Sequence, residues 1–256
     1  MTNIFLKVIW DADPILIRIG NYELSWYASA YVASLFVHYL LLRYFFRKEN
    51  KPAHHAMQIT ELLFITGIIG SRLGQVFFYE WPYYSKNLLE IPQIWKGGLS
   101  SHGSAIGVLA GILYYSIKHR WPFLYITDRI AIITLFCAGL IRIGNLFNSE
   151  IIGKPTDVSW AFMFTRIDHV WRHPSQLYDV LISWSLFAVF FLLYHRLNGK
   201  RTGLITGLFF SISFSLRALV EVYKAEATRT QWLSLPFILF GIGILIYTFK
   251  NKNSTT

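Results

Sequence analysis

Long stretches without charged residues dominate the distribution of polar and apolar positions along the chain. Leu24–Leu42, Gly97–Ile117 and Thr230–Phe249 contain no Asp, Glu, Lys or Arg. Each is close to the roughly 20 residues that a helix needs to cross a hydrocarbon core of about 30 Å. These three stretches therefore predict membrane-spanning helices.

Four further apolar stretches reach this length only if a few charged residues are accepted inside them. They are Met57–Tyr79, Phe123–Phe147, Gln176–Tyr194 and Gly203–Tyr223. Tryptophan, which prefers the membrane–water interface, stands at or beside most of the predicted helix ends. The pattern predicts an all-α polytopic membrane protein with seven transmembrane helices, forming a single integral membrane domain over residues 1–256.

Basic residues cluster in the short loops on one side of these helices. The clusters lie at residues 43–51, 118–120, 196–201 and 250–252. Because positively charged loops remain in the cytoplasm, we expect a cytoplasmic C-terminus and, with seven spans, an N-terminus outside. The first twenty residues are not expected to be a cleavable signal, since Asp11–Pro14 interrupts their apolar run. They are interpreted as a short external segment that leads into the first helix.

Two long loops fall on the predicted outer side. Glu80–Lys96 is rich in Trp, Tyr and Pro and is expected to lie along the interface. Residues 148–172 are polar and include Val158–Thr165, whose residues favour a strand. This second loop predicts a small extracytoplasmic cap.

The composition agrees with a membrane protein. Hydrophobic residues make up 54% of the chain, charged residues only 15%, and 24 Lys and Arg against 14 Asp and Glu give a net charge of +10. A disordered chain is excluded by the apolar content. The positive excess is expected to meet anionic lipid and not nucleic acid. The single cysteine, Cys137, excludes an intrachain disulfide and is expected to pack in the apolar interior.

Glycines recur at every fourth position on two of the predicted helices. Gly70 and Gly74 lie on one, and Gly103, Gly107 and Gly111 on the other. Small residues at this spacing allow two helices to approach closely in lipid. The segment Gly97–Ser104 is also expected to include irregular backbone, which is tolerated at membrane depth only where protein or water covers it.

A polar cluster stands at the predicted outer end of the fourth span. Arg142 and Asn145 share one helix face, and Asn148, Glu150 and Gly153 follow directly. An ionisable residue inside a membrane costs roughly 2.5–3.5 kcal/mol on insertion scales, so it marks a functional candidate. A helix cap without chemistry is the alternative for this cluster.

Other ionisable residues inside the predicted spans have two interpretations. Arg217 and Glu221 are one turn apart and can touch, either as a structural pair or as part of a site. His102 stands beside glycines in an uncharged span, which favours a functional role. Arg72 can be structural or functional, and a structural role is preferred for Glu61 and His38. No set of His, Asp and Glu has metal-ligand spacing on one helix, so no metal is expected.

Two arginines at membrane depth on the outer side suit a phosphate group. Guanidinium offers a planar fork of donors to phosphate oxygens, and the phosphates available at that depth belong to lipids. A histidine such as His102 can exchange a proton near neutral pH. Arg142, Arg217 and His102 together predict displacement of a phosphate ester from a lipid.

The segment Arg142–Gly153 (RIGNLFNSEIIG) fits the pattern R-x-G-N-x-x-N-x-E-x-x-G, through which the chain resembles the prolipoprotein diacylglyceryl transferases of bacteria. The resemblance runs in order from about residue 20 to 248. Its further matches are Trp26–Tyr27, Gly70–Gly74, Gly97–Gly103, His173–Tyr178, Arg217 with Glu221, and Leu233–Pro236.

The resemblance implies an activity and a location. A diacylglyceryl group moves from phosphatidylglycerol to the cysteine thiol in the signal peptide of a lipoprotein precursor, a thioether forms, and glycerol phosphate leaves. No cofactor or metal is implied. The enzyme is expected in the bacterial cytoplasmic (inner) membrane as a multi-pass protein.

The same resemblance, combined with the chemistry above, assigns the residues. His102, Arg142 and Arg217 are the expected catalytic residues, with His102 as base, as acid or as a ligand of the headgroup. Arg142 is also expected to bind phosphatidylglycerol. The other expected substrate-binding residues are Tyr27, Asn145, Glu150, Gly153 and Glu221, of which Glu221 is expected to hold Arg217 in position.

The chain departs from the family pattern at a few positions. Ser104 replaces a glycine, Asp179 a glutamate and Ser213 an aromatic residue, and Thr230–Gln231 replaces Gly-Gln. Three other functions remain open: a carrier or channel, a seven-helix receptor, and an inactive relative that only binds lipid. The absence of a repeat argues against a carrier, and a retinal receptor would need a lysine within Thr230–Phe249.

Overall fold

A computed structural model describes residues 7–225 and 234–252, most of which are helical. The chain divides into two compact units. One consists of residues up to His38 and from Asp128 onward, and the other of residues Tyr39–Thr127.

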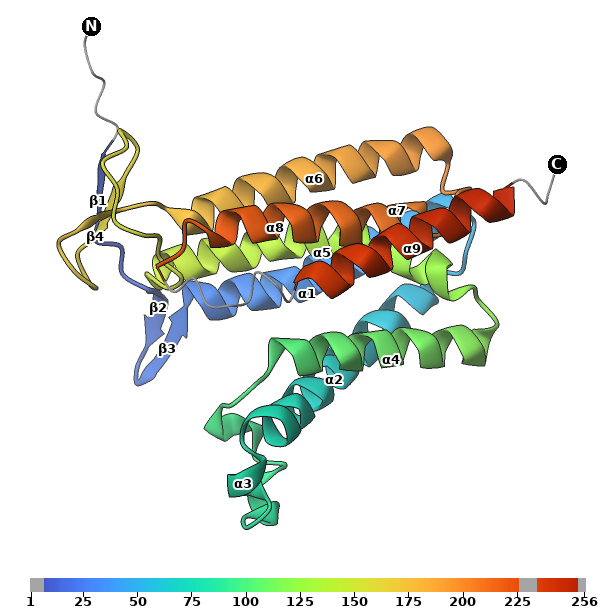
Figure 1. Cartoon of the computed structure of the whole chain (residues 1–256). Helices are drawn as coiled ribbons and strands as arrows, with labels where there is room; N and C mark the ends of the chain where they lie inside the picture. Colours follow the sequence, from blue (N-terminus) through green and yellow to red (C-terminus); the bar gives the residue numbers. More distant parts are fainter. Residues whose placement is uncertain (1–6, 226–233, 253–256) are drawn as a thin grey trace, which may run out of the picture. The chain divides into compact units, whose positions relative to one another are not determined.

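Each of the seven predicted apolar segments is largely helical (Figure 1). The first residues of the last segment, 230–233, lie outside the described part of the chain. The helices are α1 (Trp26–Lys48), α2 (His54–Gly74) with its π-helical extension η1 (Gln75–Tyr79), α4 (Ser101–His119), α5 (Phe123–Phe147), α6 (Ser175–Leu197), α7 (Leu204–Leu208) continued by η4 (Phe209–Ser213) and α8 (Phe214–Glu221), and α9 (Ser234–Lys252).

Five of the helices within residues 7–225 and 234–252 are long and apolar enough to cross a membrane. They are Trp26–Lys48, His54–Tyr79, Phe123–Phe147, Ser175–Leu197 and Leu204–Glu221, and a shorter apolar helix covers Ser234–Lys250. The expected helical architecture of a multi-span membrane protein is therefore present. The expected count of seven spans exceeds these five by two helices. One is α4, whose apolar residues are interrupted by Gly, Ser, Tyr and His, and the other is α9, which counts only as a shorter apolar helix.

In the unit of residues 39–127, helices α2 and α4 pack along the predicted glycine faces. A Cβ atom on Gly70 would lie 2.8 Å from the Cα atom of Gly107, and one on Gly74 would lie 2.6 Å from the Cα atom of Gly103. Real Cβ atoms do not approach other atoms this closely. The predicted close packing is confirmed, and it requires glycine on both helices.

Arg72 fixes the irregular segment that joins α2 to α4, which contains α3 (Trp81–Tyr84), η2 (Leu88–Glu90) and η3 (Ile94–Lys96). Its side chain is 3% exposed. The guanidinium group donates to the carbonyl oxygens of Glu90, Ile91 and Gly97 at 2.7–2.8 Å. Because a buried guanidinium needs such partners, these contacts favour the structural interpretation of Arg72.

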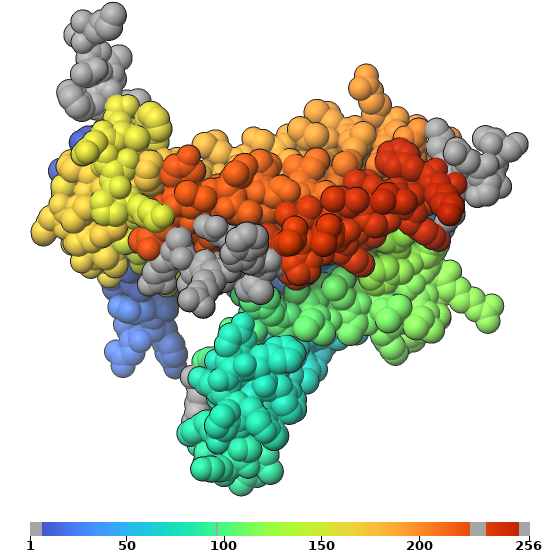
Figure 2. All heavy atoms as spheres, in the orientation of Figure 1, coloured from blue at the N-terminus to red at the C-terminus, as the bar shows by residue number. Residues whose placement is uncertain are grey.

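In the other unit, α7, η4 and α8 pack against α9, and α6 packs against α8. Figure 2 shows α8 and α9, in orange and red, on one face of this unit. The carboxylate of Asp128 on α5 accepts hydrogen bonds from the backbone N–H groups of Gly203 and Thr206 at 2.7 and 2.8 Å. Asp128 thereby binds the N-terminus of α7, where free N–H groups favour a negative charge.

A small β structure lies at one end of the helices in this unit (Figure 1). Strand β4 (Phe162–Phe164) pairs in parallel with β1 (Val8–Trp10) and antiparallel with β5 (Trp171–Arg172). The strand expected within Val158–Thr165 is therefore present as β4. Its partner β1 was not expected, because a three-residue strand leaves no periodic signal in the sequence.

A separate antiparallel hairpin consists of β2 (Ile15–Ile19) and β3 (Tyr22–Ser25). Gly20 has φ +59° in its turn, a conformation that favours glycine. The N-terminal residues lead into the first helix as expected, but through a hairpin that the sequence did not predict. Leu24, the predicted start of the first span, lies in β3, and the helix begins at Trp26.

Replacing Gly70 with alanine is expected to destabilise the α2–α4 pair by about 1–3 kcal/mol, because the new methyl group would overlap α4. Gly243 in α9 is the matched control, since a Cβ atom there meets no described atom within 4 Å. Thermal unfolding in detergent should show a lower midpoint for Gly70→Ala and no loss for Gly243→Ala. Equal midpoints for the two variants would contradict the close packing.

Candidate functional site

Arg142 lies near the end of α5 with its guanidinium group held by two neighbours. Its Nε atom is 3.0 Å from Oδ2 of Asp179 on α6, and its Nη1 atom donates to Oδ1 of Asn145 at 3.3 Å. The side chain of Arg142 is 19% exposed. No described residue is hydrogen-bonded to Nη2. The guanidinium group is therefore paired at Nε and Nη1, and Nη2 remains open to a ligand.

Glu150 organises the turn that follows α5. Its carboxylate accepts hydrogen bonds from Nδ2 of Asn145 at 3.0 Å and from Nδ2 of Asn148 at 3.3 Å. Its backbone carbonyl accepts a hydrogen bond from Nε2 of Gln176 at 2.6 Å. The polar cluster that the sequence predicted at the end of this helix is thus formed.

The turn has a strained backbone on both sides of Glu150. Ser149 and Ile151 each have φ +55°, in the left-handed region that a β-branched residue such as Ile151 rarely adopts. Residues in such conformations persist only where surrounding contacts hold them. Here the carbonyl oxygen of Ile151 accepts a hydrogen bond from Oγ of Ser175 at 2.5 Å.

Gly153 is enclosed between two segments. Its N–H group donates to the carbonyl oxygen of His173 at 3.0 Å, and it forms an antiparallel bridge with Lys224. A Cβ atom at this position would lie 2.6 Å from the Cβ atom of His173. Nη1 of Arg172 donates to the carbonyl oxygen of Gly153 at 3.2 Å. Close packing, and not a special backbone angle, therefore requires glycine at residue 153.

The sequence suggested that Glu221 binds Arg217. In the structure, Glu221 instead forms an ion pair with Lys224. Nζ of Lys224 is 3.1 Å from Oε2 of Glu221 and 3.3 Å from Oδ2 of Asp179. The carboxylate of Asp179 thus lies between Lys224 and Arg142. Sequence reasoning missed Asp179 and Lys224, although Lys224 follows Glu221 at a helical spacing of three residues.

Arg217, on α8, has an exposed side chain. Within residues 7–225 and 234–252 its side chain forms no hydrogen bond or ion pair. It differs in this respect from Arg142 and Lys224 of the same unit. Arg217 is therefore a cation whose charge is not neutralised by a described neighbour.

Tyr27 lies near the start of α1, where Gly144 of α5 comes close to it. A Cβ atom on Gly144 would lie 2.9 Å from the Cα atom of Tyr27, and the Tyr27 residue is 36% exposed. Gly144 follows Arg142 by two residues, about 200° around the helix, so this contact places Tyr27 near the end of α5 but on a different face from Arg142.

His102 belongs to the other unit, that of residues 39–127. It lies in the first turn of α4, whose N-terminus is capped by the Ser100 hydroxyl, which accepts a hydrogen bond from the N–H group of Gly103 at 3.2 Å. Nδ1 of His102 is 3.0 Å from the hydroxyl oxygen of Tyr79, and both side chains are exposed. Gly97 and Gly98, with φ +83° and +72°, confirm the irregular backbone expected before the helix.

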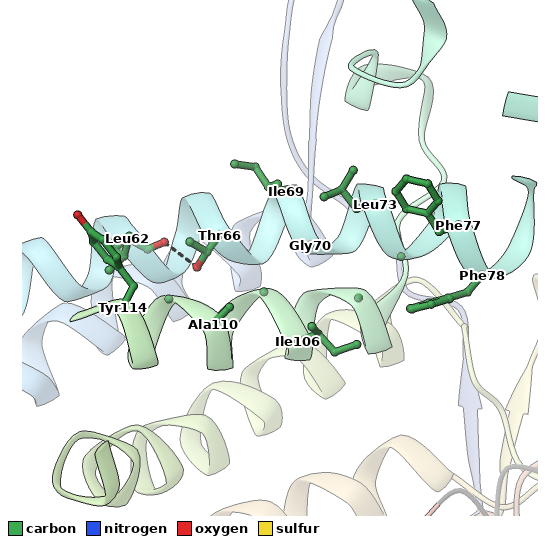
Figure 3. Close-up of a pocket in the computed structure, with 14 residues that line it drawn as sticks. Leu62, Thr66, Ile69, Gly70, Leu73, Phe77, Phe78, Ile106, Ala110 and Tyr114 are labelled. Carbon is green, nitrogen blue, oxygen red and sulfur yellow. Dashed lines mark hydrogen bonds between the residues drawn. The ribbon is translucent and has the colours of Figure 1, made fainter. Parts of the chain in front are cut away.

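An apolar groove of about 670 Å³ lies between α2 and α4 in this unit. Figure 3 shows side chains from both helices along it, including Ile69, Phe78 and Ile106. Gly103, which follows His102, lines one part of the groove. A flexible hydrocarbon chain would suit these walls.

No group of three or more His, Cys, Asp or Glu among the described residues has a geometry that could hold a metal ion. The polar side chains around Arg142 instead bind one another. Their arrangement presents a guanidinium edge to a ligand, which suits an anion with several oxygen atoms.

Comparison with known proteins gives consistent matches along nearly the whole chain. The family model described as prolipoprotein diacylglyceryl transferase matches residues 14–247. Relatives with the name phosphatidylglycerol–prolipoprotein diacylglyceryl transferase include that of Tolumonas auensis, 37% identical over 96% of this chain and 99% of its own length. That of Chloroherpeton thalassium is 36% identical over 95% of each chain, and that of Bacteroides fragilis is 32% identical over 99% of each.

Asp168 supports Gly153 through Arg172, and its contribution to stability should depend on pH. The hydrogen bonds from Arg172, at 2.6–3.2 Å, lower the pKa of Asp168 below its ordinary value of 3.8. A lowered pKa stabilises the fold above the pKa of the unfolded state, and the effect is lost as the pH falls through the folded-state value.

We expect Asp168→Asn to unfold at a lower temperature than the original protein at about pH 6. The difference should shrink at about pH 3, which lies below the ordinary pKa of 3.8, because proton binding then favours the unfolded state. Thermal unfolding of both proteins at the two pH values measures this. A difference that stays constant with pH would show that the ion pair does not support the fold.

Proposed function

The chain belongs to the prolipoprotein diacylglyceryl transferase family, and we propose that it transfers the diacylglyceryl group of phosphatidylglycerol to the signal-peptide cysteine of lipoprotein precursors. The sulfur–carbon bond of a thioether forms, the carbon–oxygen bond to the phosphate breaks, and glycerol phosphate leaves. The near full-length similarity to relatives with this name supports the proposal. The single observation that assigns this function to a site is the guanidinium group of Arg142, which is paired at Nε and Nη1 and open at Nη2.

The proposed topology has seven spans in the bacterial inner membrane. The five long apolar helices supply five of them, and α4 and α9 supply the third and the seventh. The basic clusters in the short loops support a cytoplasmic C-terminus and an N-terminus outside. Residues 148–172, with the strands that pair with them, then form the extracytoplasmic cap.

Arg142 is proposed to bind the phosphate of phosphatidylglycerol. Asp179 forms an ion pair at the Nε atom of Arg142, and Asn145 accepts a hydrogen bond from Nη1, which leaves Nη2 available to the ligand. The phosphodiester carries one negative charge, and the departing phosphate gains a second as the carbon–oxygen bond breaks. Donors that bind this growing charge lower the barrier because they bind the transition state more strongly than the substrate.

Arg217 is proposed as the second cation for the departing phosphate. A cation with a nearby carboxylate is already neutralised, whereas Arg217 has no ion-pair partner among the described residues. Its exposed guanidinium group can therefore bind a phosphate without first breaking a contact with one of them. Two cations on one phosphate would favour the doubly charged leaving group.

His102 is proposed to act as the base that takes the proton of the precursor thiol. A free thiol has a pKa of about 8.5 and attacks only as the thiolate. If Nδ1–H of His102 donates to the hydroxyl oxygen of Tyr79, Nε2 carries a free lone pair and can accept the thiol proton. Tyr79 would then fix the tautomer as well as the orientation of the ring.

The remaining substrate-binding residues are proposed to orient the lipid headgroup. Asn145 and Glu150 are hydrogen-bonded to each other, and Gly153 keeps the loop close to His173. Tyr27 lies beside Gly144 near the end of α5. Glu221 is proposed to contribute through Lys224 and not through Arg217.

The direct test is an assay of transfer with purified protein, phosphatidylglycerol vesicles and a signal peptide that contains cysteine. Mass spectrometry should detect a diacylglyceryl adduct on the cysteine peptide and none on a peptide with serine in its place. Replacing Arg142 or Arg217 with glutamine is expected to lower kcat by about 10²–10³-fold, as the loss of one charge-stabilising donor does in other enzymes.

Arg18→Gln is the control, since Arg18 is an exposed arginine whose ion-pair partners among the described residues are Asp13 and Glu23. It should retain full activity. Transfer by Arg142→Gln at the rate of Arg18→Gln would contradict the phosphate role. His102→Gln with undiminished transfer would exclude the base role alone.

A further inference from the structure

We propose that Asp179 and Lys224 are positioning residues that hold Arg142 in the orientation required for transfer, an inference that rests on the proposed function. In the sequence, Asp179 is only a departure from the family pattern, and Lys224 has no expected role. The contacts that carry the inference come from three different elements: α5, α6 and the segment after α8.

The charged side chains form a chain of alternating sign. The carboxylate of Asp179 is 3.0 Å from Nε of Arg142 and 3.3 Å from Nζ of Lys224. Nζ of Lys224 is in turn 3.1 Å from the carboxylate of Glu221. Asp179, Lys224 and Glu221 are 9%, 5% and 9% exposed. Buried groups of this kind are retained only when each has a partner of opposite charge.

Asp179 controls the direction of the guanidinium group. An arginine side chain has many rotamers, and a planar fork recognises a phosphate only when it lies in the correct plane. The carboxylate of Asp179 lies 3.0 Å from Nε as an ion pair, and Asn145 accepts a hydrogen bond from Nη1, while Nη2 has no hydrogen-bond partner among the described residues. Oδ2 of Asp179 accepts no hydrogen bond from the described residues, so it acts on Arg142 through its charge. Without Asp179 the positive charge would remain, but its orientation would not be fixed.

Lys224 allows two carboxylates to share this site. If its charge were absent, the negative charges of Asp179 and Glu221 would have no cation between them, and Asp179 would lose one of its two cationic partners. The backbone of Lys224 also bridges to Gly153, and the N–H group of Lys154 donates to the carbonyl oxygen of Tyr223 at 2.7 Å. Lys224 thereby connects the charged chain to the loop that contains Glu150 and Gly153.

Lys224 differs in its proposed role from Arg142 and Arg217, because its charge is already neutralised by carboxylates. Two carboxylates surround its ammonium group, and its side chain is only 6% exposed. A lipid phosphate would have to displace both carboxylates to bind it. Lys224 is therefore expected to act through Asp179 and not by direct contact with the substrate.

The test compares Asp179→Asn with Asp128→Asn. Both residues are buried aspartates, but Asp128 binds the N-terminus of α7 and makes no contact with Arg142. Asp179→Asn should lower kcat by about 10²-fold, as a small misplacement of a catalytic group does, and should change KM for phosphatidylglycerol little. Asp128→Asn should lower the unfolding temperature while the folded protein keeps its kcat.

Conservative replacement provides a second comparison. Lys224→Arg keeps the charge between the two carboxylates and should retain most of the activity. Lys224→Met keeps a similar volume without the charge and should lower kcat as Asp179→Asn does. If Lys224→Met kept full activity, the proposed role of Lys224 would be wrong.

A measurement that does not depend on turnover reports on the Arg142–Asp179 contact itself. The Nε–H signal of Arg142 in a ¹⁵N spectrum can be assigned by its loss in Arg142→Lys. Its chemical shift should change in Asp179→Asn, which removes a negative charge 3.0 Å from Nε, and should stay the same in Asp128→Asn. An unchanged chemical shift in Asp179→Asn would overturn the inference.

The outcomes separate the two proposals. An original protein that transfers no diacylglyceryl group would overturn the proposed function, while the chemical-shift measurement would still decide whether Asp179 is paired with Arg142. An active original protein with undiminished kcat in Asp179→Asn would overturn the positioning role and leave the function intact. A loss of stability in Asp179→Asn with a normal kcat for the folded protein would also overturn it.

Discussion

An ionised side chain that leaves water for the interior of a helix bundle must be met by opposite charge or by hydrogen-bond partners, and the structure depends on this constraint. Arg142, Asp179, Lys224 and Glu221 satisfy it by alternating in sign. Elsewhere, Asp128 satisfies it at the N-terminus of α7. Because each of these groups needs its partner, the helices that carry them are fixed relative to one another within the unit.

The same constraint determines what remains available for chemistry. Lys224 is neutralised by two carboxylates, and Arg142 is held on one edge, whereas Arg217 has no ion-pair partner among the described residues. A ligand with negative oxygens is therefore expected at the open edge of Arg142 and at Arg217. In the proposed site, this division leaves Arg142 and Arg217 available to bind a growing negative charge.

Much of the architecture could be predicted from the sequence because it rests on local patterns. Apolar stretches located the helices, and the spacing of Gly70, Gly74, Gly103 and Gly107 located the close contact between α2 and α4. The polar cluster from Arg142 to Gly153 was also predictable, since its residues are neighbours in the chain.

Partners that are distant in the sequence could not be predicted in this way. Asp179 binds Arg142 from a different helix, and no spacing rule relates the two. Glu221 is four residues from Arg217 and three from Lys224, so spacing alone allowed either pair, and the structure has the second. Strand β1 pairs with β4, which lies about 150 residues later in the chain. Its three residues are too few to show a periodic pattern of their own.

The central claim is that the open edge of Arg142 receives the phosphate group. The most direct measurement is an experimental structure of the protein in lipid with glycerol phosphate, the proposed leaving group, bound to it. The account predicts phosphate oxygens within hydrogen-bond distance of Arg142, with Asp179 still at Nε. Glycerol phosphate bound with no contact to Arg142, or a guanidinium group turned away from Asp179, would contradict the account.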